Sequence, residues 1–499
     1  MSARRAGAVE AVLAIDLGTT EAKVGVVSLD GRLLGLARAR YPLDLDESTG
    51  RAEQDPEDWW RASLVAAREA LEAVGRSGAP EIVAIGLDGH GPSLAAVDAA
   101  GRPVCPAMIW LDRRDTGEQA ELERRSGLLG WSLGVLPAAL WLERHRPAVA
   151  EQARWYLNTW EYLGLRMTGR AATSLVPGQR LPEPALLAEV SLPPSKIADP
   201  VPAGTVLGGL LPDVAASLGV ATGTSVVAGH VDAFSSFHGA GIREPGDALD
   251  AGGTAGGFGV YWDRPLDVQG AFCTPASIPG RFVIGGAMAA TGKALDWFRD
   301  TVLGGESSTE ALIAEAAATP PGADGLLFLP YLAGERSPIW DPEARGVLAG
   351  LTLAHSRGHI TRAILEAAAL SIRHVAEPIL SAGVTVRSMV VTGGPAHSDT
   401  WNQIKADVTG FPIEVPSILE TAVVGSAIVG AVGVGAYADL PTAIAAMTTI
   451  VRRLAPDASR RALYDGLYDA YKRLYPATAP ILRGLGADAG NRELAEARR

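Results

Sequence analysis

The sequence AVLAIDLGTTEAKVGVVS, residues 11–28, decides the fold of this chain. Two apolar runs flank a turn at residues 18–20, which is the pattern of two antiparallel strands. A third run, RLLGLARA, follows the dipeptide at residues 30–31, Asp-Gly, which favours a hairpin turn. The chain is therefore predicted to open with a β-meander whose first turn follows a carboxylate, Asp16.

A helix is predicted directly after the meander. Asp55 is a good N-cap, Pro56 suits the first helical position, and Asp58 supplies a third-position carboxylate before Gly75 ends the helix. The apolar run EIVAIGLDG then predicts a strand that ends in a glycine turn. Residues from about 110 to 225 mix helical patterns with proline-rich loops, and we interpret them as an inserted, substrate-facing part of the first domain.

The opening plan returns half a chain later. DALDAGGTAGGFGVYW, residues 247–262, repeats the first strand pair, with LDAGGT beside the earlier IDLGTT, which indicates a duplicated domain. Beyond it we expect a helix capped by Ser356, a strand SMVVTGG, a helix DTWNQIKADVTG, a strand FPIEV and a closing helix RALYDGLYDAYKRLY. The predicted domains are residues 1–245 and 246–485, and the tail at 486–499 is expected to be frayed.

Composition excludes several classes of protein. With 499 residues, 47% hydrophobic, the chain is expected to fold into two or more domains. A net charge of -12 without a basic run argues against nucleic acid as a partner. Only Cys105 and Cys273 are present, which favours a reducing cytoplasm over a disulfide framework. Residues 422–438 carry no charge, but their glycines favour a buried helix over a membrane span.

The first glycine turn has a use in phosphate chemistry. Glycine lets the backbone approach a polyphosphate, so that its amides and the hydroxyls of Thr19 and Thr20 donate hydrogen bonds, while Asp16 can hold Mg²⁺. An ordinary hairpin with turn-forming residues is the alternative. The similar pair Gly253 and Thr254 in the second half favours the phosphate-binding interpretation.

Seven motifs, in order over most of the chain, resemble the FGGY family of carbohydrate kinases, within the superfamily of sugar kinases, heat-shock chaperones and actin. The similarity is greatest to xylulokinase-like members. The motifs are AIDLGTT, AEQDPEDWW, PAMIWLDRR, VVAGHVDAF, FLPYLAGERSPIWDPEARGVLAGL, VTGGPAHSDTWNQIKAD and ETAVVGSA.

The resemblance implies an α/β fold of two ribonuclease H-like, actin-like ATPase domains with a catalytic cleft between them. It implies an enzyme that transfers the γ-phosphoryl group of ATP to a hydroxyl of a small ketose or polyol. Asp232, in VVAGHVDAF, matches the family's catalytic base. A sugar hydroxyl needs such a base because it is a poor nucleophile until a carboxylate accepts its proton.

The resemblance also implies residues that bind the sugar and residues that bind the nucleotide. It implies Mg²⁺ and ATP as cofactors, with Asp16 as the metal-binding residue. The expected sugar-binding residues are Gly89, His90, Trp110, Asp112 and Arg114. The expected nucleotide-binding residues are Thr19, Thr20, Gly253, Thr254, Gly393, Gly394 and Asn402, with Gly425 as a further candidate. A loop histidine and tight glycine turns remain the simpler alternatives for His90 and for Gly393–Gly394.

Departures from the family pattern leave the substrate open. Ala138 stands where the family usually has Lys, Leu111 replaces a common polar residue, and GHGPS replaces Gln-Met-His-Gly. Kinases of ribulose, a tetritol or glycerol, and a catalytically weak sugar sensor, are the alternatives. An actin-like or chaperone ATPase without a sugar substrate should lack Asp232 and the segment around Trp110, and both are present. A homodimer is also left open.

Overall fold

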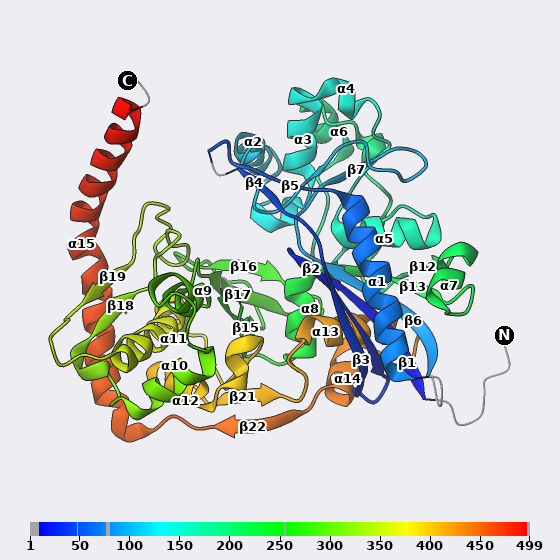
Figure 1. The fold of residues 1–499 in the computed structure, drawn as a ribbon. Helices are drawn as coiled ribbons and strands as arrows, with labels where there is room; N and C mark the ends of the chain where they lie inside the picture. The colour runs from blue at the N-terminus through cyan, green and yellow to red at the C-terminus, as the bar shows by residue number, and fades with distance from the viewer. Residues whose placement is uncertain (1–8, 47, 76–79, 254–255, 497–499) are drawn as a thin grey trace. The chain divides into compact units, whose positions relative to one another are not determined.

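The structure is a computed structural model that describes residues 9–46, 48–75, 80–253 and 256–496, with side chains described up to residue 485. By contacts the chain forms two compact units (Figure 1). Unit 1 comprises Met1–Arg243, Pro275–Pro279 and Glu420–Thr449, and unit 2 comprises Glu244–Thr274, Gly280–Leu419 and Ile450–Arg499. Each unit is built on its own large sheet.

Unit 1 holds a six-stranded sheet that contains the predicted meander. In spatial order its strands are β12 (Val206–Gly209), β13 (Ser225–Val231), β6 (Glu81–Gly89), β1 (Glu10–Leu17), β2 (Glu21–Ser28) and β3 (Leu33–Arg40). β1 pairs antiparallel with β2 and parallel with β6, and β13 runs parallel to β6. The predicted meander and the strand EIVAIGLDG are therefore confirmed.

Alternation along β1 decides which side chains meet which helix. Leu13, Ile15 and Leu17 belong to the apolar cluster that contains Trp59 of α1 (Pro56–Val74). Successive side chains of a strand point to opposite faces, so Asp16 lies on the other face of the sheet. That second face is covered by the helices α8 (Asp232–Gly239) and α13 (Thr421–Gly433), both in contact with β6.

The predicted start and end of α1 are confirmed. The Asp55 side chain accepts a hydrogen bond of 2.9 Å from the backbone N–H of Glu57, and Pro56 is the first helical residue. Gly75 ends the helix at a φ of 82°, a backbone conformation that glycine adopts at little cost.

The uncharged segment around residue 425 forms the buried helix α13, as predicted. A Cβ atom added at Gly425 would lie 1.9 Å from the carbonyl oxygen of Ser235, so α8 and α13 pack backbone to backbone. Gly86 of β6 makes a similarly close approach, with its Cβ position 2.2 Å from the Ser426 carbonyl oxygen. Within the described residues, no helix is long and apolar enough to cross a membrane.

The division into units differs from the predicted domain boundary in one stretch. The sequence analysis placed residues 420–449 in the second domain, whereas by contacts they belong to unit 1. The physical reason is α13, which packs on α8 and on the strands β1, β6 and β13. The cleft predicted between the two domains stays a prediction.

Residues between β3 and β13 add helices and three small sheets to unit 1. The strands are β4 (Asp44–Asp46), β5 (Arg51–Gln54), β7 (Ala95–Val97), β8 (Ala107–Met108), β9 (Trp155–Leu157), β10 (Thr173–Leu175) and β11 (Pro200–Pro202). The helices are α2 (Thr116–Ser126), α3 (Leu136–His145), α4 (Pro147–Ala150), α5 (Thr159–Thr168), α6 (Pro184–Glu189) and α7 (Pro212–Leu218), and α14 (Leu440–Met447) follows α13.

Taken from the opposite edge of the sheet, unit 2 repeats the strand order of unit 1 and adds one strand, β16 (Phe272–Pro275). Its sheet runs β16, β17 (Phe282–Ala287), β15 (Gly257–Trp262), β14 (Asp247–Asp250), β20 (Ser388–Val391), β21 (Ile413–Pro416) and β22 (Ile450–Leu454). β14 pairs antiparallel with β15 and parallel with β20, as β1 does with β2 and β6. The predicted duplication of the opening plan is therefore confirmed at the level of topology.

Helices and one small sheet complete unit 2. They are α9 (Lys293–Trp297), α10 (Thr309–Ala318), α11 (Arg357–Ser381), α12 (Asp399–Thr409), α15 (Arg461–Glu496), β18 (Leu327–Leu329) and β19 (Val347–Ala349). Ser356 caps α11 in a capping box with His359, as the sequence predicted for the cap. The backbone of α15 is helical to Glu496 and so includes most of the tail that the sequence analysis expected to be frayed.

Candidate active site

Carboxylates line up across the strand ends of unit 1. Asp16 of β1 lies directly opposite Asp88 of β6, and Asp88 in turn lies opposite His230 of β13. Asp16 is 3% exposed and Asp88 is fully buried. One Asp16 oxygen and both Asp88 oxygens have no hydrogen-bond partner. Buried carboxylates without partners are costly to keep, so this row is a candidate for a bound group.

Burial governs the protonation of this pair. The pKa of Asp16 is raised by burial, against the opposing attraction of Lys23, whose Nζ lies 4.0 Å from Asp16 Oδ2. The pKa of Asp88 is raised well above its ordinary value by burial and by the neighbouring Asp16 charge. Lys23 also pairs with Glu420 at 3.3 Å, so its charge is shared.

Asp232 is the first residue of α8, immediately after β13. One of its carboxylate oxygens accepts a hydrogen bond of 2.7 Å from the Ala233 N–H. Burial and the Asp16 charge raise the pKa of Asp232 to about 7. A carboxylate with a pKa near neutrality is suited to accept a proton from a substrate hydroxyl.

The turn after β1 is tied to the segment predicted to bind sugar. The Trp110 indole N–H donates a hydrogen bond of 3.0 Å to the Thr19 hydroxyl, and the Gln54 amide donates to the Thr19 carbonyl at 2.7 Å. Thr20 is exposed. The structure therefore brings the predicted phosphate turn and Trp110 together within unit 1.

Gly89 and His90 follow Asp88 in a tightly packed place. A Cβ atom at Gly89 would lie 2.4 Å from the Thr159 hydroxyl oxygen. The His90 ring is 1% exposed, packs edge-on against Trp59 and shares a hydrogen bond of 2.8 Å between its Nδ1 and the Ser93 hydroxyl. Burial lowers the pKa of His90 to about 3, so the ring is neutral. Its Nε2 has no partner, and its role as a sugar contact stays a prediction.

Asp112 and Arg114 bind each other. The Arg114 guanidinium donates to Asp112 at 2.7 Å and to Glu53 at 2.7 Å, and it stacks 4.6 Å from the Trp141 ring centre. Asp112 also accepts the Ala52 N–H at 2.9 Å. This network gives both side chains a structural role beside Trp110, and their predicted contact with the sugar is not tested by it.

In unit 2 the two predicted glycine turns lie side by side. They follow the parallel strands β14 and β20, and a Cβ atom at Gly393 would lie 2.6 Å from the Gly252 carbonyl oxygen. Gly393 has a φ of 67°, where glycine is favoured. A Cβ atom at Gly394 would meet nothing within 4 Å, so its backbone is open to a ligand. Gly253 ends the described part of this turn, and Thr254 lies outside the described residues.

Asn402 and Gly425 are enclosed by protein. Asn402 is fully buried and donates a hydrogen bond of 2.9 Å to the Ala396 carbonyl, while its side-chain oxygen has no partner. The space that a side chain at Gly425 would need is occupied by the Ser235 backbone, and Gly425 lies in unit 1. Close helix packing therefore explains Gly425 without a nucleotide.

Asp88 is the residue that sequence analysis missed. It stands near the end of an otherwise apolar strand and directly precedes Gly89, much as Asp16 and Asp250 each stand two residues before a glycine. That pattern was a signal, but only the strand register shows that Asp88 lies opposite Asp16.

The ribonuclease H-like sheet is duplicated in this chain. A threonine turn follows β1 in unit 1, and glycine turns follow β14 and β20 in unit 2. This combination defines the class of actin-like ATPases. Residues 11–239 match the N-terminal domain of the FGGY family of carbohydrate kinases, and residues 251–434 match its C-terminal domain.

Individual relatives agree with this match. The chain is 31% identical to xylulose kinase of Bacillus subtilis over 94% of this chain and 97% of the relative. It is 29% identical to glycerol kinase of Thermus brockianus, over 93% and 98%. The crystal structure of xylulose kinase from Rhodospirillum rubrum has 30% identity, covers 95% of this chain and 100% of its own, and superposes with a TM-score of 0.80.

The chain belongs to the FGGY family of carbohydrate kinases. It is an ATP-dependent sugar kinase of the xylulokinase-like kind, which confirms the fold class, the enzyme class and the use of ATP that the sequence predicted.

Proposed function

We propose that this kinase phosphorylates a hydroxyl of a small neutral ketose or polyol, with D-xylulose as the first candidate, and that Asp232 is the general base. The observation that carries the proposal is the position of Asp232 at the start of α8, with its pKa raised to about 7. In this role the carboxylate accepts the hydroxyl proton while the phosphoryl group is transferred.

Charge in unit 1 favours a neutral substrate. Asp16 and Asp232 act on each other electrostatically, and Asp88 lies beside Asp16. The nearby cations are already engaged, Lys23 by Asp16 and Glu420, and Arg114 by Asp112 and Glu53. With these two cations of the described residues already paired, a sugar acid would meet carboxylate repulsion here.

We propose Mg²⁺ as the second cofactor, with Asp16 as its protein ligand, directly or through water. Carboxylate oxygens suit this ion, and Asp16 has a buried oxygen without a partner. Among the residues that the structure describes, no group of three or more acidic, His or Cys side chains could hold a metal. That fits Mg²⁺, which keeps several waters and is held by one or two carboxylates and the phosphates. When bound, it would neutralise charge on the transferred group.

Two lesser proposals complete the picture. The cytoplasm is the proposed compartment, because both cysteines are free thiols and the reaction consumes ATP. We also propose that the protein forms a homodimer, which a measurement of its molecular mass in solution would test.

The test is a substrate screen for ADP release with Mg-ATP, using D-xylulose, D- and L-ribulose, erythritol, glycerol and D-gluconate. We expect the highest kcat/KM for a neutral ketose and the lowest for gluconate. Asp232→Asn serves as the control for contaminating kinases. A preference for gluconate would contradict the charge argument.

A further inference from the structure

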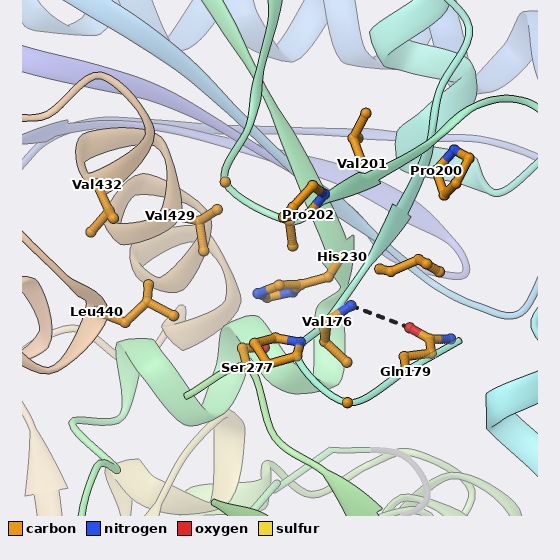
Figure 2. Close-up of a pocket in the computed structure, with 15 residues that line it drawn as sticks. Val176, Gln179, Pro200, Val201, Pro202, His230, Ser277, Val429, Val432 and Leu440 are labelled. Carbon is orange, nitrogen blue, oxygen red and sulfur yellow. Dashed lines mark hydrogen bonds between the residues drawn. The ribbon is translucent and has the colours of Figure 1, made fainter. Parts of the chain in front are cut away.

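Unit 1 contains a cavity of about 450 Å³ that none of the predicted sugar or nucleotide residues lines (Figure 2). Its walls come from the segments around β10 and β11, the end of β13, residue 277, and the α13–α14 region. This volume lies within the range of small-molecule sites, about 300–1,000 Å³.

The cavity has a buried apolar floor and a more exposed rim. Val176, Val201 and Val429 are 7%, 8% and 3% exposed, and they form the floor. Pro177 and Pro202 at the rim are exposed. An occupant would therefore bury apolar surface on valine and proline side chains and could enter from solvent.

Two polar groups in this apolar lining have unused hydrogen-bonding capacity. His230 and Ser277 are 3% and 4% exposed, and His230 Nε2 and the Ser277 hydroxyl have no partner. Figure 2 shows the His230 ring extending into the space between Val176 and Val429, with Ser277 beside it. Buried polar atoms without a hydrogen-bond partner are uncommon in native proteins, and here they indicate a missing partner.

The hydrogen bonds of His230 define what that partner offers. Its Nδ1 lies 3.2 Å from the Val231 carbonyl oxygen, which can only accept, and 3.5 Å from the Ser235 hydroxyl, which can accept as well as donate, so Nδ1 is assigned the proton. In the neutral ring Nε2 is then an acceptor. The occupant must donate a hydrogen bond to Nε2, as a hydroxyl group does.

The lining does not suit a sugar or ATP, the substrates of a sugar kinase. A sugar or polyol would place several hydroxyl groups against valine and proline side chains, where each unpaired hydroxyl is costly. ATP carries phosphate charge, and no cationic side chain lines the cavity among the described residues.

We propose that this cavity, between the β10–β11 segment and α13, is a binding site for a small neutral molecule with an apolar body and one hydroxyl group, which donates to His230 Nε2 beside Ser277. The site would lie against the strand that leads into Asp232 two residues later, on the side of the sheet that faces α13.

The test uses cyclohexanol as the probe on the full chain without nucleotide or sugar. Binding is followed by calorimetry and by the ¹⁵N shift of the His230 Nε2, which should change when that nitrogen accepts a hydrogen bond. Cyclohexanone is the matched probe, because it has the same ring but no donor. We expect saturable binding of cyclohexanol and roughly 3- to 10-fold weaker binding of cyclohexanone.

A pair of variants locates the probe. Val432→Trp fills the cavity from α13 and should abolish binding, whereas Ala436→Trp, at an exposed position that does not line the cavity, should leave it unchanged. Equal binding by wild type and Val432→Trp would overturn the proposal, as would equal affinity for the two probes. If Val432→Trp melts early, the comparison of the two probes on wild type still decides.

Discussion

Asp16 and Asp250 occupy corresponding positions in the two copies of the sheet, at the ends of β1 and β14, yet their surroundings differ. Asp250 forms a buried ion pair with Lys405, and the two side chains are 4% and 3% exposed. Asp16 faces another carboxylate, Asp88, and its nearest cation is 4.0 Å away. In unit 2 the carboxylate is neutralised by the fold itself. In unit 1 it keeps capacity for a ligand, so we expect the metal-binding role at Asp16 and a structural role at Asp250.

The largest expected effect tests whether the chemistry belongs to unit 1. Asp232→Asn keeps the size of the side chain but cannot accept the sugar proton, so kcat should fall by roughly 10²- to 10⁴-fold. ADP affinity, measured by calorimetry, should stay near the wild-type value. Asp213→Asn, an exposed carboxylate in the first turn of α7, is the matched control. Wild-type turnover of Asp232→Asn would place the base elsewhere.

A stability experiment addresses the two copies directly. Asp250→Asn leaves the Lys405 ammonium buried and unpaired, at a cost of about 3–5 kcal/mol. The melting temperature of the affected transition should fall by roughly 6–20 °C, as scanning calorimetry would show. Asp16→Asn removes a like charge beside Asp88 and should not lower the melting temperature, although turnover should drop strongly.

A rescue variant controls the interpretation of Asp250→Asn. Replacing both partners by apolar side chains, Asp250→Leu with Lys405→Met, should regain much of the lost stability, because no buried charge remains. Equal melting temperatures of wild type and Asp250→Asn would show that the ion pair contributes little and that the contrast with Asp16 is mistaken.

The pH dependence of kcat/KM should follow the titration of Asp232 in unit 1. Burial and the Asp16 charge raise the pKa of Asp232 to about 7, so the carboxyl is mostly protonated below that pH. Only the deprotonated carboxylate can act as a base. Activity should therefore decline about tenfold per pH unit below this value. In Asp16→Asn the acidic limb of the kcat/KM profile should move to lower pH, because the Asp16 charge no longer raises the pKa of Asp232. A shift to higher pH would contradict this account.

The smallest expected effect concerns the turn after β1. Trp110→Phe removes the hydrogen bond to the Thr19 hydroxyl, worth about 0.5–1.5 kcal/mol, so KM for ATP should rise by roughly 2- to 10-fold. Trp131→Phe, at a tryptophan that is 54% exposed, is the control. No change in either variant would mean that the Thr19 hydroxyl does not position ATP.

Local chemistry made much of the fold predictable. The cap Asp55, the stop Gly75 and the hairpin at residues 30–31 follow from short-range rules, and these features are present. The duplicated turn was readable because strand, carboxylate and glycine recur in one order. The family motifs added the predicted role of Asp232, which no spacing rule supplies.

What escaped prediction depends on pairing between distant residues. The partnership of Asp16 with Asp88 comes from the register of β1 and β6, and the neutralisation of Asp250 comes from Lys405 in α12, 155 positions away. His90 carries no sequence signal that it is buried against Trp59. Such contacts are decided by tertiary packing, which a single sequence does not display.

The placement of α13 in unit 1 has a consequence for how the protein is made on the ribosome. The sheet face that carries Gly86 receives part of its cover, α13, from residues 420–449, which emerge long after Arg243. At about 5–20 residues per second, that cover arrives roughly 10 to 40 s later. During this interval the part of the sheet face that α13 covers is open to solvent, so we expect unit 1 to need chaperone protection until unit 2 has largely been synthesised.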